Sequence, residues 1–179
     1  MDKKELRRLI RSLKQQHSPS ELHAMSCALC ERVVSTPQWR SATTILLYHA
    51  LPDEVDTTPL LEAALSAGKQ VLLPVVVDAE NMVLRVYSGA ESMSVGSFGI
   101  LEPTGPDFPS EAYPSIQLAI VPGMSFDDSC HRLGRGKGYY DRLLPQLPEA
   151  YLIGICFPFQ HQPSIPSLSH DIVMHQVIY

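Results

Sequence analysis

The residues with the clearest chemical potential lie between positions 132 and 141, in the stretch RLGRGKGYYD. Within it, residues 134–138, here called the glycine loop, alternate three glycines with Arg135 and Lys137. Glycine lets the main chain approach a ligand closely, and successive backbone N–H groups can form a concave anion site. A helix beginning near Tyr139 would direct its positive end at the same place. The glycine loop therefore predicts a polyphosphate site.

Asp141 offers a hard oxygen ligand just after the glycine loop, suited to a magnesium ion that bridges phosphates. The spacing fits neither common phosphate-binding pattern. No stretch has the Walker spacing, and the dinucleotide fingerprint needs a glycine where Tyr139 stands. A flexible surface turn with solvated charges is therefore the alternative interpretation.

The distribution of charge is informative. The net charge of −5 argues against a general nucleic-acid-binding surface. Of the 14 Lys and Arg residues, six lie in residues 3–14 and four in residues 132–142. Two basic segments in an acidic protein could converge on one polyanion.

Residues 3–15 are predicted to form the helix that carries the first basic segment, because Leu6, Leu9, Ile10 and Leu13 repeat with helical spacing. Lys3 is four positions before Arg7, so both cations share a face. From the pattern alone, a solvated basic face is the favoured interpretation.

The rest of the chain alternates helices with buried strands. Helices are expected at 19–34, 59–67 and 138–144, and strands at 43–49, 70–77, 82–87, 116–121, 152–156 and 172–178. This alternation predicts one domain over residues 1–179, a three-layer α/β/α sandwich with a mostly parallel sheet.

Three details of this arrangement bear on the site. Glu54 follows the first strand at its carboxyl end, where ligands bind in open α/β sheets. Pro74 is expected near an edge or a bulge of its strand. Residues 88–115 are interpreted as one irregular segment.

Several classes of protein are disfavoured. No apolar run reaches the ~20 residues that span a bilayer. The charged start is not followed by an apolar signal region, so we expect a cytoplasmic protein. Cys27 and Cys30 have the spacing of half a zinc site, but a second pair is missing, so all four cysteines are interpreted as free thiols.

Residues 121–127 (VPGMSFD) together with residues 132–141 resemble the signature of the 5-formyltetrahydrofolate cyclo-ligase family, also called 5,10-methenyltetrahydrofolate synthetases. The resemblance extends to residues 3–7 (KKELR), 53–57 (DEVDT), 98–103 (FGILEP) and 170–171 (HD). It implies a fold similar to the sugar-isomerase and CoA-transferase type. It also implies ATP- and Mg²⁺-dependent closure of 5-formyltetrahydrofolate to 5,10-methenyltetrahydrofolate, with ADP and phosphate released via a phosphorylated formyl intermediate.

The resemblance also implies roles for individual residues. The expected ATP contacts are Lys3, Lys4, Glu5, Leu6, Arg7, Arg132, Leu133, Gly134, Arg135, Gly136, Lys137, Gly138, Tyr139 and Tyr140. The expected folate contacts are His49, Glu54, Arg135, Gly136, Lys137, Gly138 and Tyr139. Asp141 and Asp171 are expected to hold Mg²⁺.

Catalysis is assigned to Arg135, Lys137 and Tyr139, with no covalent nucleophile among the cysteines or histidines. Two positions depart from the family pattern. Cys130 stands where many members carry glycine, which predicts a differently shaped turn before Arg132, and His175 stands where a carboxylate is common.

Two other functions fit parts of the sequence. A regulatory module that binds a nucleotide without turnover would need neither Glu54 nor Asp171, so their joint presence favours the enzyme. Nucleic-acid binding through the basic first helix is disfavoured by the net charge and by the lack of interleaved aromatic residues. We therefore expect a monomer that takes a small folate, with one or several glutamates, and neither nucleic acid nor membrane as a partner.

Overall fold

A seven-stranded sheet forms the centre of the computed structural model, which describes residues 1–96, 99–168 and 171–179. Its strand order is β12-β10-β7-β1-β2-β3-β6. The bounds are β1 Thr44–Leu46, β2 Gln70–Val76, β3 Met82–Tyr87, β6 Asp107–Phe108, β7 Leu118–Pro122, β10 Tyr151–Ile155 and β12 Gln176–Ile178. The pairings from β12 to β2 are parallel, whereas β3 is antiparallel to β2 and to β6. The predicted mostly parallel sheet is confirmed.

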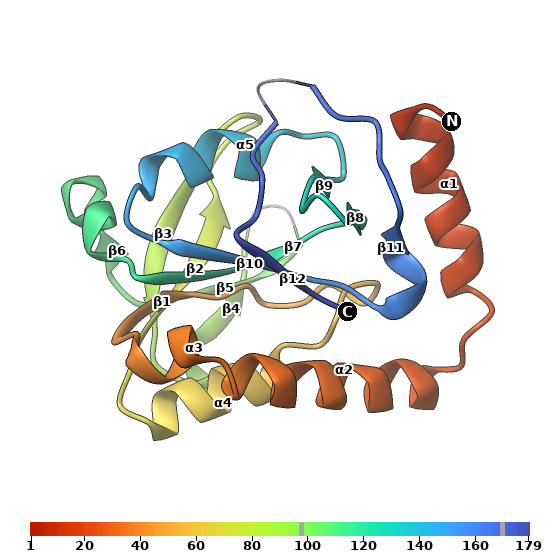
Figure 1. Cartoon of the computed structure of the whole chain (residues 1–179). Coiled ribbons are helices and arrows are strands. Elements are labelled where there is room, and N and C mark those ends of the chain that lie inside the picture. The colour runs from red at the N-terminus through yellow and green to blue at the C-terminus, as the bar shows by residue number, and fades with distance from the viewer. Residues whose placement is uncertain (97–98, 169–170) are drawn as a thin grey trace.

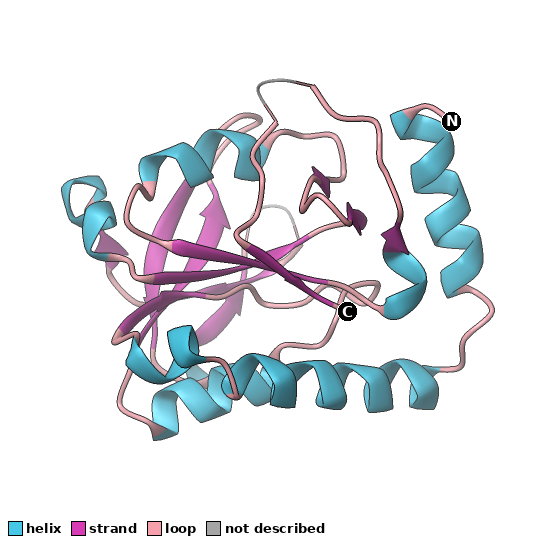
Figure 2. Cartoon of the chain, viewed as in Figure 1, coloured by secondary structure: helices cyan, strands magenta, loops and turns pink. Residues whose placement is uncertain are grey.

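Helices lie on both sides of this sheet (Figures 1 and 2). On one side are α2 (Pro19–Val34), α3 (Pro37–Ser41) and α4 (Thr58–Ser66). The other side carries α5 (Tyr139–Leu143) and 3₁₀ turns at Leu144–Gln146 and Ser110–Ser115. Successive strand residues face opposite layers, so Ile45 and Leu47 belong to one core cluster and Leu46 to the other. The three-layer prediction is confirmed, with the layer around α5 the thinner one.

Helix α1 (Lys3–Lys14) stands beside the sheet and does not cover either face (Figure 1). Its buried residues Leu6 and Ile10 form a small separate core with Met124, Leu133 and Ile165. A capping box between Asp2 and Glu5 begins the helix. The first basic segment is thereby placed next to the second one.

Short strands account for the main differences from the sequence-based expectation. Residues 88–115 contain β4 (Met93–Val95), β5 (Leu101–Pro103) and β6, so the expectation of one irregular segment is wrong. Near the glycine loop, β11 (His161–Gln162), β8 (Ser125–Asp127) and β9 (Arg132–Leu133) form a three-stranded sheet. Strands of two or three residues are too short to show a period of two in the sequence.

The strands that surround Pro74 explain how a proline fits there. The register pairs Pro74 with Leu84 of β3, while the parallel register with β1 ends at Leu72. Beyond Leu72, β2 is therefore an edge on its β1 side, as expected for a strand proline. In the described parts of the chain, no helix is long and apolar enough to cross a membrane.

The two departures from the family pattern differ in their structural consequences. Cys130 adopts φ +62°, a left-handed conformation that glycine favours, and its N–H donates to the carbonyl of Asp127 at 2.9 Å. His175 Nδ1 accepts a hydrogen bond from the Leu152 N–H at 2.9 Å, a role that a carboxylate oxygen could also fill. The cysteine therefore strains the turn before Arg132.

This strain gives a stability prediction. A left-handed conformation costs a residue with a Cβ about 1–2 kcal/mol, and glycine relieves this strain. Glycine also makes the unfolded chain more flexible, which offsets ~0.4–1 kcal/mol of the stability gained. We expect Cys130→Gly to be more stable than Cys130→Ala by about 0.5–1 kcal/mol in urea unfolding. Both variants remove the same thiol, so an alanine variant of equal or higher stability would contradict the assignment of strain.

Candidate functional site

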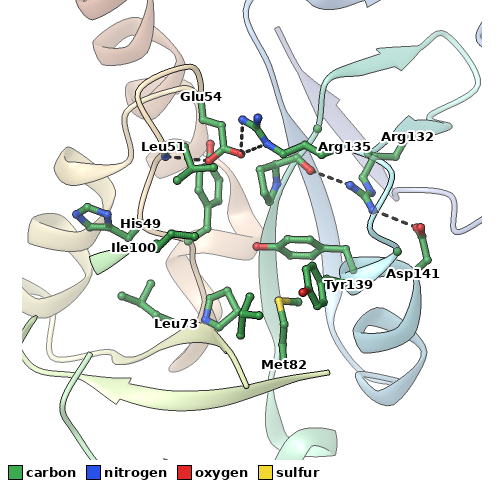
Figure 3. A pocket seen from close by; sticks show the side chains of 18 of the residues that line it. His49, Leu51, Glu54, Leu73, Met82, Ile100, Arg132, Arg135, Tyr139 and Asp141 are labelled. Carbon is green, nitrogen blue, oxygen red and sulfur yellow. Dashed lines mark hydrogen bonds and ion pairs between the residues drawn. The ribbon is translucent and has the colours of Figure 1, made fainter. Parts of the chain in front are cut away.

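A pocket of about 240 Å³ lies between the carboxyl ends of the central strands and the glycine loop (Figure 3). Nine of the residues singled out from the sequence line it: His49, Glu54, Arg132, Gly134, Arg135, Gly138, Tyr139, Tyr140 and Asp141. They come from the loop after β1 and from the continuous stretch formed by β9, the glycine loop and the first turn of α5. Strand order therefore brings together two regions that are about eighty positions apart in the sequence.

The backbone of the glycine loop requires glycine at two positions. Gly136 and Gly138 have φ of +102° and +72°, and Gly138 directly precedes α5. An L-residue at either position would be strained. The expected need for glycine conformational freedom is confirmed.

Helix α1 lies against the glycine loop, so the two basic segments do converge. Arg7 Nε donates to the carbonyl of Gly134 at 2.8 Å, and Lys3 Nζ pairs with Asp171 Oδ2 at 2.7 Å. The side chains of Leu6 and Leu133 are buried in the core between helix and loop. Any contact of these two leucines with a nucleotide would therefore use the main chain.

Not every residue of the predicted nucleotide site lies at the pocket. Gly136 and Lys137 are exposed and are not among the described residues that line it. Lys4 and Glu5 are also exposed, and the Glu5 carboxylate accepts a hydrogen bond from the Asp2 N–H at 2.7 Å. Ligand contacts by these four residues, and by the other predicted site residues, stay predictions.

Arg132 is the most enclosed cation of the site, with 5% of its side chain exposed. Nη1 donates to the Pro122 carbonyl at 3.1 Å and Nη2 to Asp141 Oδ1 at 3.0 Å, while the guanidinium lies 5.3 Å from the centre of the Tyr140 ring. Its Nε is buried and has no hydrogen-bond partner among the described residues. A buried donor without a partner is costly, so the site suits a ligand that supplies an acceptor.

Arg135 joins the glycine loop to the loop after β1. Its Nε and Nη2 donate to Glu54 Oε1 at 3.1 and 3.0 Å, and Nη2 also donates to Asp53 (Figure 3 shows the Glu54 bonds). Partial burial raises the pKa of Asp53, but the hydrogen bond and charge of Arg135 outweigh it and leave that pKa below its ordinary value. Asp53 and Arg135 are thus both charged at neutral pH.

Tyr139 connects the start of α5 to the turn between β2 and β3. Its hydroxyl donates to the Asp78 carbonyl at 2.9 Å, and the Arg142 guanidinium lies 5.5 Å from the centre of its ring. Arg142 also donates to the carbonyls of Glu80 and Lys137, at 2.6 and 2.9 Å. No pattern in the sequence indicated this contact.

One wall of the pocket is apolar and was not predicted as a binding surface. It is formed by side chains of β2, β3 and the region around β5: Leu73, Pro74, Val76, Met82, Ile100, Leu101 and Pro103. Residues 100–103 belong to the stretch that resembles the family, while the β2 and β3 residues were interpreted as core. The position of β2 at a local edge exposes them to the pocket.

The two predicted magnesium ligands each face a cation. Asp141 pairs with Arg132 and Asp171 with Lys3. Among the described residues, no group of three or more His, Cys, Asp or Glu side chains is arranged to hold a metal ion. The flanking residues Phe98 and His170 of the sequence resemblance lie outside the described part of the chain.

Asp127 holds the turn that leads into this site. It is 3% exposed; Oδ1 accepts from the N–H groups of Ser129 and His131 at 3.0 and 2.9 Å, and Oδ2 accepts from Ile165 N–H at 3.0 Å. Burial raises the pKa of Asp127, but these hydrogen bonds outweigh it and lower the pKa overall. The carboxylate therefore ties the turn to the segment that packs against α1.

The family model described as the 5-formyltetrahydrofolate cyclo-ligase family matches residues 1–179. A probable 5-formyltetrahydrofolate cyclo-ligase of Schizosaccharomyces pombe is 30% identical, over 96% of this chain and 91% of the relative. A 5-formyltetrahydrofolate cyclo-ligase of Mus musculus is 28% identical, over 98% of this chain and 90% of the relative.

Solved structures agree with these relatives. The 5,10-methenyltetrahydrofolate synthetase of Aquifex aeolicus superimposes with a TM-score of 0.85 at 31% identity, covering 99% of this chain and 89% of the other. A synthetase from Mycoplasma pneumoniae superimposes with a TM-score of 0.80 at 23% identity, covering 99% and 98%, which shows the shared fold.

The buried Asp127 predicts a defined pH dependence of stability. We expect Asp127→Asn to lower the free energy of unfolding at pH 7 by about 1–3 kcal/mol, because the amide presents a donor to N–H groups. A lowered folded-state pKa means that the carboxylate stabilises the fold above the ordinary value of 3.8 and loses this effect as pH falls through the folded value. The difference in the free energy of unfolding between Asp127→Asn and the unchanged protein should therefore shrink as pH falls through the folded-state pKa. Urea unfolding at a series of pH values measures it.

The surface variant Asp107→Asn is the matched control, since Asp107 forms an exposed ion pair with Arg85. It should change stability little at any of these pH values. A difference between Asp127→Asn and the unchanged protein that is constant with pH would contradict the assigned role.

Proposed function

Because this chain belongs to the 5-formyltetrahydrofolate cyclo-ligase family, we propose that it converts 5-formyltetrahydrofolate to 5,10-methenyltetrahydrofolate while ATP yields ADP and phosphate. The observation that carries the proposal is the composition of one pocket. Arg132, Arg135 and the glycine loop form a cationic end, and an apolar wall forms the rest. Such a pocket matches a polyphosphate at one end and a flat, mostly uncharged ring system at the other.

In this proposal the polyphosphate binds along the glycine loop. The backbone N–H groups of residues 134–138 supply dipoles, while Arg132, Arg135 and Lys137 supply charge. Lys3 and Arg7 extend the cationic surface from α1, which already contacts the loop and the segment before β12. The unpartnered Nε–H group of Arg132 would donate a hydrogen bond to a phosphate oxygen, which supports a place for Arg132 in the ATP site.

The folate would occupy the apolar part of the pocket. His49, Ile100 and Glu54 lie on one side of it and Tyr139 on the other, with Leu73 of β2 and Met82 of β3 below them in this view (Figure 3). The Glu54 carboxylate would accept hydrogen bonds from ring N–H groups of the folate. We propose that this one domain acts as a monomer.

The proposed reaction has two steps, in the order predicted from the sequence. The formyl oxygen attacks the γ-phosphorus and ADP leaves, which gives a phosphorylated formyl group. N10 then attacks the formyl carbon and loses its proton, and phosphate leaves as the ring closes. Phosphoryl transfer asks the protein for alignment and for neutralisation of charge, which Arg135, Lys137 and the loop dipoles provide.

Asp141 and Asp171 fit a role in holding Mg²⁺. Magnesium in nucleotide sites takes one or two carboxylates and completes its shell with phosphate oxygens and water, so two aspartates are enough. Both carboxylates are now paired with cations that the polyphosphate would attract. Once bound, the ion would offset negative charge on the phosphate oxygens.

The first test is turnover. Purified protein with 5-formyltetrahydrofolate, Mg²⁺ and ATP should show a rise in the absorbance band of methenyl-folate that depends on ATP. A protein that binds ATP by calorimetry but gives no rise would contradict the enzyme and favour the regulatory nucleotide-binding module.

A second test examines Arg132. A lysine cannot make the bonds to Pro122 and Asp141 and also present a planar face to Tyr140. We expect Arg132→Lys to raise the KM for ATP about 10- to 100-fold, the effect of losing one hydrogen bond to a charged group. Arg85→Lys, at an exposed ion pair outside the pocket lining, is the matched control and should leave the KM unchanged. Equal KM values for ATP in the two variants would contradict the assignment of Arg132 to the ATP site.

A further inference from the structure

The side chain of Arg135 is held by two acidic residues of the loop after β1. Nε and Nη2 bond to Oε1 of Glu54, and Nη2 bonds to Asp53 as well. The other Glu54 oxygen, Oε2, accepts the Leu51 N–H at 3.0 Å. Both Glu54 oxygens are thus engaged, with 12% of the side chain exposed.

This arrangement competes with both substrates of the proposed function, on which the inference rests. Arg135 must turn toward phosphate oxygens in order to neutralise them. Glu54 Oε1 must release Arg135 before it can accept a hydrogen bond from a folate N–H group. Each substrate therefore needs one partner of the same ion pair, and each would free the other partner by binding.

Asp53 is the third member of this cluster, and no ligand contact has been assigned to it. It does not line the pocket among the described residues, and about a third of its side chain is exposed. Its contact with Nη2 holds the guanidinium on the side of the loop after β1. Lys14 of α1 donates to the neighbouring Pro52 carbonyl at 3.3 Å, so a second cation lies close to this acidic loop.

We propose that Asp53 is a positioning residue that stabilises the Arg135–Glu54 pair and thereby couples the binding of ATP to the binding of the folate. Two arrangements follow, a paired one and a released one, and each substrate binds the released one. The apparent affinity for either substrate alone is reduced by the fraction of protein that is paired. With one substrate bound, the second meets released protein and binds more tightly, by the same factor in both orders.

Removal of the Asp53 charge should weaken the paired arrangement while leaving Glu54 and Arg135 in place. A partly exposed ion pair makes a modest contribution, so we expect Asp53→Asn to tighten the binding of each substrate alone by about two- to fivefold. The gain in affinity caused by the other substrate should fall by the same two- to fivefold factor. A residue with a purely structural role would weaken binding or leave the coupling unchanged.

The experiment is a titration-calorimetry cycle with 5-formyltetrahydrofolate and a non-hydrolysable ATP analogue with Mg²⁺. Each ligand is titrated into protein alone and into protein saturated with the other, and the ratio of the two Kd values is the coupling factor. The unchanged protein, Asp53→Asn, Asp53→Glu and the control Asp107→Asn are compared. We expect Asp53→Glu and Asp107→Asn to keep the coupling factor of the unchanged protein.

Two results would overturn the proposal. One is a coupling factor of one in the unchanged protein, meaning that neither substrate changes the affinity for the other. This measurement does not depend on any variant. The other is an Asp53→Asn protein with an unaltered coupling factor and unaltered affinities for the single substrates. Failure of the proposed function has a different signature, since turnover that is absent in the unchanged protein contradicts the activity whatever the binding cycle shows.

Discussion

The contact between α1 and the glycine loop is the interaction on which the site depends. The glycine loop has no regular secondary structure of its own, and its backbone is held from outside by the Arg7 bond to Gly134 and by the small core around Leu6 and Leu133. Since a flexible loop would lose conformational entropy on binding a polyphosphate, a loop already held in place binds at lower cost. The first helix is therefore part of the site as well as part of the fold.

Charge in the site is arranged as pairs between residues expected to bind different ligands. Arg132 forms an ion pair with Asp141, Lys3 with Asp171 and Arg135 with Glu54. Buried or half-buried charges are costly without partners, so these pairs stabilise the cations and the carboxylates in their positions. A polyphosphate could take over the cations and leave the carboxylates available to a metal ion or a folate, with little net change in the number of charge contacts.

The apolar half of the pocket follows from the lengths of the strands. Pairing of β1 with β2 stops at Leu72, so the later residues of β2 lack a strand on that side and face the pocket. Pro74, which donates no backbone hydrogen bond, lies in this stretch, which pairs with β3 but not with β1. Residues 100–103, around β5, and Tyr139 of α5 line the pocket from other directions. The pocket thus forms where the pairing of β1 with β2 ends before the end of β2.

The sequence by itself determined the elements whose signals are local or periodic. The spacing of Leu6 and Ile10 predicted α1, the apolar runs predicted the parallel strands, and the glycines at 136 and 138 indicated backbone that only glycine adopts easily. It also indicated Arg135, Lys137 and Asp141, because ligand chemistry restricts the residue types, whereas Lys3, Arg7 and Asp171 came only from the resemblance to the family. Only the tertiary structure decided which of these groups meet. The pairing of Arg135 with Glu54 and Asp53, the docking of Tyr139 on Asp78 and the apolar wall of β2 join residues far apart in the chain. No pattern in the sequence encodes such contacts, because they depend on strand order and on where each strand stops pairing.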